Sequence, residues 1–196
     1  MNQRIFLTQA LTASVWLLLQ PPLALGGTQH AHIHGVASLQ VAVEGERLTL
    51  LFSSPLDNLV GYERAPRSAQ EKAAFQDMMT RLQRPEALFV PSPEARCVRT
   101  SAQIDSPVSA TQAVAASKTE PTGAAKDKAG RRGDPDVHAG LTAEIVFTCE
   151  RRQSLNGLSV PAFDAFPKLK RIDAQIATGA KQTAATLTTR DRRLAW

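Results

Sequence analysis

Three histidines alternate with small or apolar residues near the start of the chain, in the segment His30-Ala-His-Ile-His34. The chain has only 4 histidines among its 196 residues, so composition does not explain the cluster. On a β-strand, side chains at positions i, i+2 and i+4 project from one face, with neighbours about 7 Å apart. Two such imidazoles can bind one borderline-soft ion, and zinc accepts histidine nitrogen readily. The spacing therefore predicts a divalent metal site, with zinc favoured.

Further ligands for this site are available elsewhere in the sequence. The fourth histidine, His138, precedes a strongly alternating segment and would meet the cluster if the two strands are neighbours. Asp57 and Glu63 are the nearest carboxylate candidates, although pairing with Arg64 or Arg67 in a turn is the favoured interpretation for both. The alternative for the cluster is a set of solvated surface residues. The candidate ligands are His30, His32, His34 and His138, of which the two at 32 and 34 come first.

The N-terminus has the features of a secretory signal peptide. Arg4 precedes an apolar segment from Ile5 to Leu19, and the small residues of Ala24–Gly26 predict cleavage after Gly26. The apolar segment is too short to indicate a stable membrane span. We therefore expect residues 1–26 to direct export, to the periplasm of a Gram-negative bacterium, and residues 27–196 to form a single domain.

Cys97 and Cys149 are the only cysteines. In an exported protein a pair of cysteines favours a disulfide, whereas two buried thiols are the alternative. The bond would close a loop of about fifty residues and stabilise the fold by about 4 kcal/mol in the chain-entropy model. No CxxC spacing supports a metal role for the pair.

Charge and motifs exclude several classes of function. The formal net charge of +5 falls to +4 without Arg4, a mild excess that does not indicate nucleic-acid binding. The few aromatic residues are not interleaved with the basic clusters at 168–171 and 190–193, as binding of single-stranded nucleic acid would require. The sequence has no HExxH helix, nucleophile elbow or phosphate-binding glycine loop, so we predict no enzyme. A hydrolytic three-histidine zinc site is the weaker alternative.

Hydrophobic periodicity predicts a hairpin and one main helix. Apolar residues alternate from His30 to Val43 and again from Arg47 to Ser54, with a turn at Glu44-Gly45-Glu46 between them. Ser68-Ala-Gln-Glu71 has the form of a capping box, so a helix begins there and ends before Pro85. The expected core-facing stripe of this helix is Phe75, Met78, Met79 and Leu82.

The remainder of the chain is strand-rich, with one segment of a different kind. Residues 106–137 are dominated by Ala, Ser, Thr, Lys, Gly and Pro, which predicts a disordered insert because so little apolar surface can be buried. Strands are expected near 97–103, 141–149, 155–160, 172–176 and 183–188, and a packed turn at 163–167. The predicted fold class is α+β and β-rich: a mostly antiparallel sheet of about six strands, with one main helix.

Several motifs together resemble those of a bacterial family. They are His32-Ile-His-Gly-Val-Ala37, Val41-Ala-Val-Glu-Gly45, Leu56-Asp-Asn-Leu-Val-Gly-Tyr-Glu-Arg-Ala-Pro66, Phe147-Thr-Cys149 and Phe163-Asp-Ala-Phe-Pro167. In this order, over nearly the whole mature chain, they resemble the ZrgA family of periplasmic zinc-related proteins. The resemblance implies zinc binding in the periplasm and assistance to a high-affinity zinc ABC importer.

One departure from the family pattern limits the expected capacity. Many members carry a tract rich in histidine and aspartate before the strand that ends in the second cysteine, and here only Asp134, Asp136 and His138 remain of it. A single site around His32 and His34 is therefore expected, in a protein that captures zinc without catalysis. Two chains could pool their histidines in a homodimer. The alternative function is a non-metal envelope interaction module that uses the sheet and the basic segment 190–193.

Overall fold

The computed structural model describes residues 33–108 and 139–196, which belong to one compact unit, Ala31–Trp196. The predicted signal peptide, His30, His32 and His138 lie outside the described residues. Within these two ranges, no helix has the length and apolar character needed to cross a membrane.

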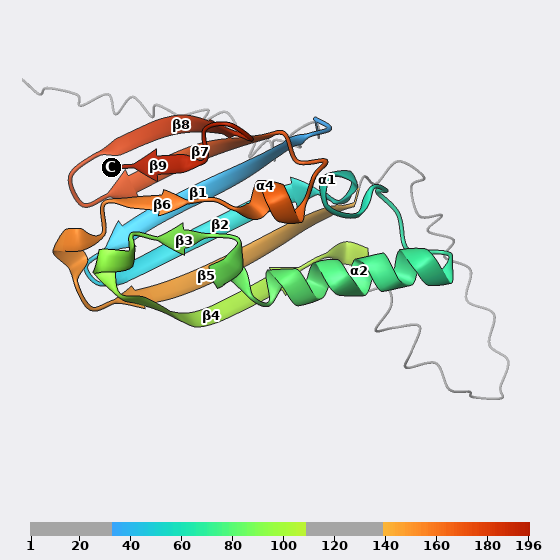
Figure 1. The fold of residues 1–196 in the computed structure, drawn as a ribbon, viewed down its shortest axis with the longest axis horizontal. Helices are drawn as coiled ribbons and strands as arrows, with labels where there is room; N and C mark the ends of the chain where they lie inside the picture. Colours follow the sequence, from blue (N-terminus) through green and yellow to red (C-terminus); the bar gives the residue numbers. More distant parts are fainter. Residues whose placement is uncertain (1–32, 109–138) are drawn as a thin grey trace, which may run out of the picture. The chain divides into compact units, whose positions relative to one another are not determined.

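The main element is a six-stranded sheet with the strand order β4-β5-β2-β1-β7-β8 (Figure 1). All neighbours are antiparallel except β1 and β7, which run parallel. The α+β, mostly antiparallel architecture with one main helix is therefore confirmed. The strands are β1 Val36–Glu44, β2 Arg47–Pro55, β4 Cys97–Asp105, β5 Gly140–Cys149, β7 Arg171–Thr178 and β8 Gln182–Thr188.

A second, three-stranded sheet packs on the first and was not predicted as a sheet. It has the order β3-β6-β9 and lies in front of the large sheet in Figure 1. Its strands are β3 Val90–Pro91, β6 Gly157–Ser159 and β9 Arg193–Ala195. Leu158 and Leu194 are buried, and the rings of Phe52 and Phe89 lie 5.4 Å apart. The hydrophobic core therefore fills the space between the two sheets.

The predicted helix is α2, Ala69–Leu82. The Ser68 side chain accepts from the Glu71 backbone N–H, and the Glu71 carboxylate accepts from the Ser68 N–H, so the capping box is confirmed. Phe75, Met78 and Leu82 are buried and Met79 is partly buried against the core, which confirms the helical stripe. The shorter helices are α1 Leu56–Val60 and α4 Ala162–Ala165, with 3-10 turns at Pro85–Ala87, Pro93–Ala95 and Arg152–Ser154.

The first strand begins later than predicted. Gly35 has a φ of +81°, and its carbonyl accepts from the N–H groups of Lys170 and Arg171 at 2.8 and 2.9 Å. The chain therefore turns before β1, and Val36 N–H donates to Ile33 O at 3.0 Å. His34 lies in this turn, and Ile33, one of the apolar residues that alternate with the histidines, is 60% exposed. The prediction of a strand through residues 33–35, with His34 in a row on its face, was wrong.

The disulfide prediction is confirmed. Cys97 and Cys149 lie opposite each other at the ends of β4 and β5, and their sulfur atoms are bonded. Cys149 is fully buried, while Cys97 packs against the edge of the core. The bond joins two neighbouring strands that are 52 residues apart in the chain.

The first residues of the predicted disordered insert belong to the folded structure. Ser106 and Val108 are buried, and Val108 belongs to the hydrophobic core, because a short helical turn follows β4. The chain joins the described structure again at Ala139, immediately before β5. The remainder of the predicted insert lies outside the described residues.

Candidate metal centre

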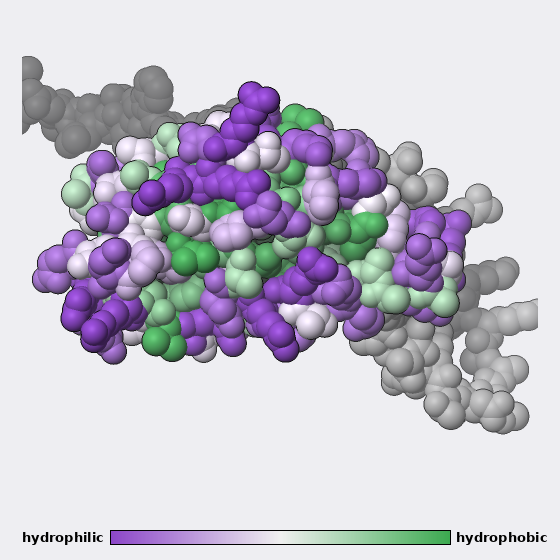
Figure 2. All heavy atoms as spheres, in the orientation of Figure 1, coloured by the Kyte–Doolittle hydropathy of each residue, from purple (hydrophilic) through white to green (hydrophobic). Residues whose placement is uncertain are grey.

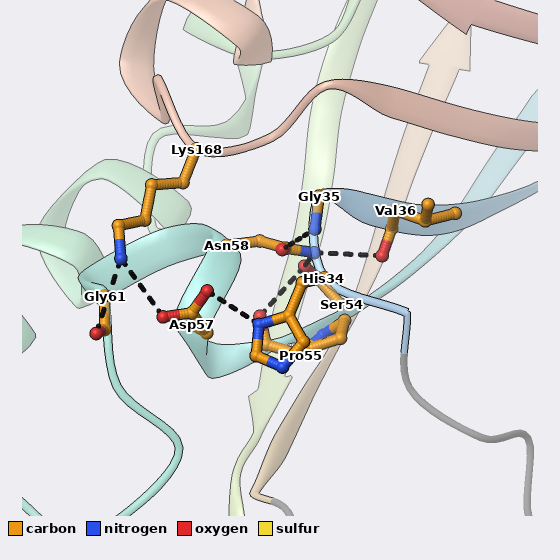
Figure 3. Close-up of polar contacts among 9 residues, drawn as sticks. All are labelled: His34, Gly35, Val36, Ser54, Pro55, Asp57, Asn58, Gly61 and Lys168. Carbon is orange, nitrogen blue, oxygen red and sulfur yellow. Dashed lines mark hydrogen bonds and ion pairs between the residues drawn. The ribbon is translucent and has the colours of Figure 1, made fainter.

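A histidine and an aspartate from separate elements form an ion pair at the end of the sheet where β1 and β7 begin (Figure 3). His34 Nδ1 lies 3.0 Å from Asp57 Oδ2, and Asp57 is in the first turn of α1. The His34 side chain is 69% exposed and that of Asp57 is 20% exposed. The ring nitrogen that does not contact Asp57 points away from the carboxylate in Figure 3. This nitrogen, Nε2, is the atom through which His34 could bind a metal ion.

Asn58 joins α1 to the start of β1 and so positions His34. Its side chain is 1% exposed and makes three hydrogen bonds. Oδ1 accepts from Gly35 N–H at 2.6 Å, and Nδ2 donates to Val36 O at 2.9 Å and to Ser54 Oγ at 3.1 Å. Because these partners are backbone groups at the end of the turn and a hydroxyl on β2, Asn58 fixes the turn that carries His34.

Lys168 completes the polar arrangement from a third segment, the loop before β7. Its ammonium group donates to Asp57 Oδ1 at 3.1 Å and to Gly61 O at 3.5 Å. Gly61 ends α1 with a φ of +92°, which turns its carbonyl toward the lysine. Asp57 therefore accepts from His34 and from Lys168 through different oxygens, which fixes the plane of its carboxylate.

The charges in this region alter the protonation of both partners. The hydrogen bond to Asp57 raises the pKa of His34 above its ordinary 6.5, and the negative charge of Glu63 acts in the same direction. The hydrogen bond to His34 lowers the pKa of Asp57 below 3.8 against a weaker, opposing effect of burial, and Lys168 adds to the lowering. An ionised carboxylate beside His34 Nδ1 favours the tautomer in which Nε2 carries the lone pair, as in many zinc sites.

Of the four predicted histidine ligands, only His34 lies among the described residues. Within residues 33–108 and 139–196, no three His, Cys, Asp or Glu side chains are grouped so that they could hold a metal ion. His138 was expected to meet the histidine cluster if the strands that follow them, β5 and β1, are neighbours. They are not neighbours, because β2 lies between them. Ala139 nevertheless contacts the start of α1: its carbonyl accepts from Leu56 N–H at 3.0 Å, and its N–H donates to Glu63 O at 3.4 Å.

The favoured interpretation of Asp57 was wrong. Asp57 pairs with His34 and Lys168 rather than with Arg64 or Arg67. Arg64 forms a two-pronged ion pair with Glu71 at 3.1 and 2.6 Å.

Sequence reasoning missed Asn58 and Lys168. Lys168 lies 111 residues from the carboxylate that it contacts, so no local pattern links the two. Asn58, next to Asp57, belongs to no sequence motif that predicts its role. Its hydrogen bonds are with backbone groups of a turn 22 and 23 residues earlier. Neither residue could be found without the tertiary contacts.

Comparison with known protein families gives a match that covers the described structure. A family model described as ZrgA family zinc uptake protein matches residues 31–196. None of the curated proteins compared with the chain is similar enough to match it. The family match covers all of the described structure, including His34, Asp57 and both cysteines. The chain therefore belongs to the ZrgA family of zinc uptake proteins.

Proposed function

We propose that this protein captures zinc in the bacterial periplasm and passes it to a zinc importer, without catalysing a reaction. The observation that carries the proposal is the His34–Asp57 pair, at 3.0 Å, in a chain of a zinc uptake family. In the proposed site His34 binds zinc through Nε2, while Nδ1–H donates to Asp57. A carboxylate in this position orients the ring and makes the coordinating nitrogen more basic.

Two of the other candidate ligands, His32 and His138, directly precede described residues that lie beside this pair. His32 precedes Ile33, which accepts a backbone hydrogen bond in the turn of His34. His138 precedes Ala139, which exchanges backbone hydrogen bonds with Leu56 and Glu63 on either side of Asp57. We propose that His30, His32 and His138 complete the coordination of His34, with tetrahedral nitrogen ligation as zinc prefers. A site without thiolate ligands suits a carrier, because it can release its metal.

Export is the second part of the proposal. Residues 1–26 would be removed as a signal peptide, and the disulfide between Cys97 and Cys149 suits an oxidising compartment such as the periplasm. The test is to express the full sequence in a Gram-negative host and fractionate the cells. A protein in the periplasmic fraction with a mass that starts at residue 27 supports export, and an unprocessed chain in the cytoplasm contradicts it.

Zinc binding is tested by calorimetric titration of the metal-free protein. We expect micromolar or tighter binding by the wild type and its loss in the double variant His32→Ala/His34→Ala. His138→Ala, compared in parallel, separates the two parts of the proposed ligand set. Equal binding by the wild type and the double variant would move the site away from His34. If the wild type does not bind zinc, the capture function is wrong and an envelope interaction module becomes the better explanation.

A further inference from the structure

We propose that two copies of this chain form a symmetric dimer by antiparallel pairing of β8 with β8. This strand is the outermost one at its end of the large sheet. Its sequence, Gln182-Thr-Ala-Ala-Thr-Leu-Thr188, contains no charged residue and no proline. Its register with β7 is continuous from Arg171↔Thr188 to Ala177↔Gln182, without a bulge. A regular, uncharged edge strand is a template for a further strand, and monomeric proteins usually protect such edges.

The opposite edge of the same sheet is protected in the usual ways. β4 carries a bulge between Arg99 and Ser101, which interrupts its register with β5. It also carries charges at Arg99 and Asp105. Bulges and edge charges prevent the approach of another strand. Because the chain protects one edge and leaves the other regular and uncharged, β8 is the edge available for association.

The backbone of β8 has donors and acceptors that point away from β7. Thr178 N–H donates to Lys181 O at 2.9 Å, and hydrogen-bonded and non-bonded pairs then alternate along an antiparallel ladder. By this alternation the groups that point outward belong to Gln182, Ala184 and Thr186. All three residues are exposed. Outside the β7–β8 ladder their backbone groups form no hydrogen bond with another described residue. Thr188 N–H is already used, since it donates to Asp191 O.

A twofold axis at Ala184 uses every one of these groups. Ala184 then pairs with Ala184 of the second copy, and Gln182 pairs with Thr186 in both directions. The three outward residues of each copy have one donor and one acceptor each, which makes six hydrogen bonds across the dimer. Lys181 faces Leu187 of the other copy, so no like charges lie opposite each other. The residue at the axis is small, which lets the two strands approach closely.

A second copy fits this edge better than an unrelated apolar partner does. The face of the molecule drawn in Figure 2 shows polar side chains interspersed with smaller apolar areas. Among the large apolar side chains of the described residues, Ile33 and Val98 are the exposed ones. Association through backbone hydrogen bonds needs no apolar patch, and pairing of identical edges closes after two copies.

In this dimer the two candidate zinc sites stay apart. Ala184 is in register with Gln175 on β7, and Gln175 with Gln40 on β1. Val36, the first residue of β1, lies four residues before Gln40, about 13 Å along the strand, and the turn that carries His34 precedes it, two strands away from β8. The two His34 side chains are therefore more than about 30 Å apart, and each chain keeps its own site. The dimer does not depend on zinc, so a failure of the zinc proposal leaves it standing.

The test is sedimentation velocity of the exported wild-type protein over a range of micromolar concentrations, with chelator present. We expect a concentration-dependent dimer. The variants Ala184→Lys and Ala184→Glu place like charges at the axis, so each alone is expected to be monomeric, and an equal mixture of the two is expected to form dimers again. Val98→Lys, a charge added on β4 at the other edge, is the matched control and leaves the dimer unchanged.

Hydrogen exchange supplies the residue-level readout. The amides of Gln182, Ala184 and Thr186 are expected to exchange fast when the protein is dilute and slowly when it is concentrated. A wild type that is monomeric at all concentrations overturns the proposal. So does a dimer that survives both Ala184 variants or dissociates with Val98→Lys. Slow exchange at these three amides in the dilute monomer would mean that another part of the same chain covers the edge, and it also overturns the proposal.

Discussion

Removal of the Asp57 carboxylate is expected to weaken zinc binding at His34 without unfolding the protein. Asp57 Oδ2 lies 3.0 Å from His34 Nδ1, on the side of the ring opposite to the proposed metal. Asp57→Asn keeps an oxygen that can accept from Nδ1–H but removes the negative charge. Asp57→Ala removes both. The expected order of zinc affinity is therefore wild type, then Asp57→Asn, then Asp57→Ala.

The size of the effect follows from the position of the carboxylate. Loss of the group that orients a metal-bound histidine typically costs about 10- to 100-fold in metal affinity. At about 1.36 kcal/mol for each factor of ten, this is roughly 1.4 to 2.7 kcal/mol of binding free energy. We expect Asp57→Asn near the lower figure, because the hydrogen bond is retained, and Asp57→Ala near the upper one. Buried Asn58 still braces the turn in both variants, so the fold should persist.

The assay is competition calorimetry against a chelator of known affinity, with circular dichroism to verify the fold. Asp164→Ala is a matched control, since Asp164 also pairs with a cation, Arg192, but contacts no histidine among the described residues. Its zinc affinity should equal that of the wild type. Zinc binding by Asp57→Ala that matches the wild type would refute the assigned role of Asp57, and equal weakening by Asp164→Ala would show a nonspecific effect of charge.

Three further predictions concern the same site and the core. Lys168→Met should tighten zinc binding a few-fold in low salt, because the ammonium group that contacts Asp57 repels a dication bound at His34. The gain should shrink as salt is added, and weaker binding would mean that Lys168 is needed to hold Asp57. By NMR the imidazole of His34 in the metal-free protein should titrate above pH 6.5, and Asp57→Asn should return it toward that value. The pair stabilises the fold most between pH 3.8 and 6.5, because its contribution falls as pH rises through the raised pKa of His34 and as pH drops through the lowered pKa of Asp57. An unchanged His34 titration in the variant would contradict the contact. Reduction of the disulfide should lower the free energy of unfolding by about 4 kcal/mol in denaturant titration, and the double variant Cys97→Ser/Cys149→Ser should behave like the reduced protein. Equal stability of the oxidised and reduced forms would contradict this.

Local signals predicted the elements that local physics controls. Alternating apolar residues located the β1–β2 hairpin, with Leu39, Leu50 and Phe52 buried as expected. The capping box located the start of α2, because its hydrogen bonds join residues three apart. These features depend on interactions between residues that are close in the sequence, so they can be predicted from it.

The start of β1 shows where local patterns fail. The alternation of His30, His32 and His34 is as compatible with a strand as the residues that follow it. The chain turns at Gly35 because its carbonyl bonds to Lys170 and Arg171, residues more than 130 positions later. No local pattern encodes that contact, and the strand-face arrangement of the histidines was therefore predicted where a turn exists.

For this protein the sequence by itself determined the strand-rich class, the main helix and the pairing of the two cysteines, and it singled out His34 as a candidate metal ligand. Residue types, short-range spacing and the predicted export signal were sufficient for these inferences. The tertiary structure alone decided that β1 and β7 run parallel, that a small sheet covers the core, and that Asp57, Asn58 and Lys168 surround the turn of His34. It also decided that β8 forms the regular, uncharged edge of the large sheet and β4 the bulged, charged edge. The physical reason is the same in each case: these features depend on hydrogen bonds and packing between segments far apart in the chain, which form only when the sheet assembles.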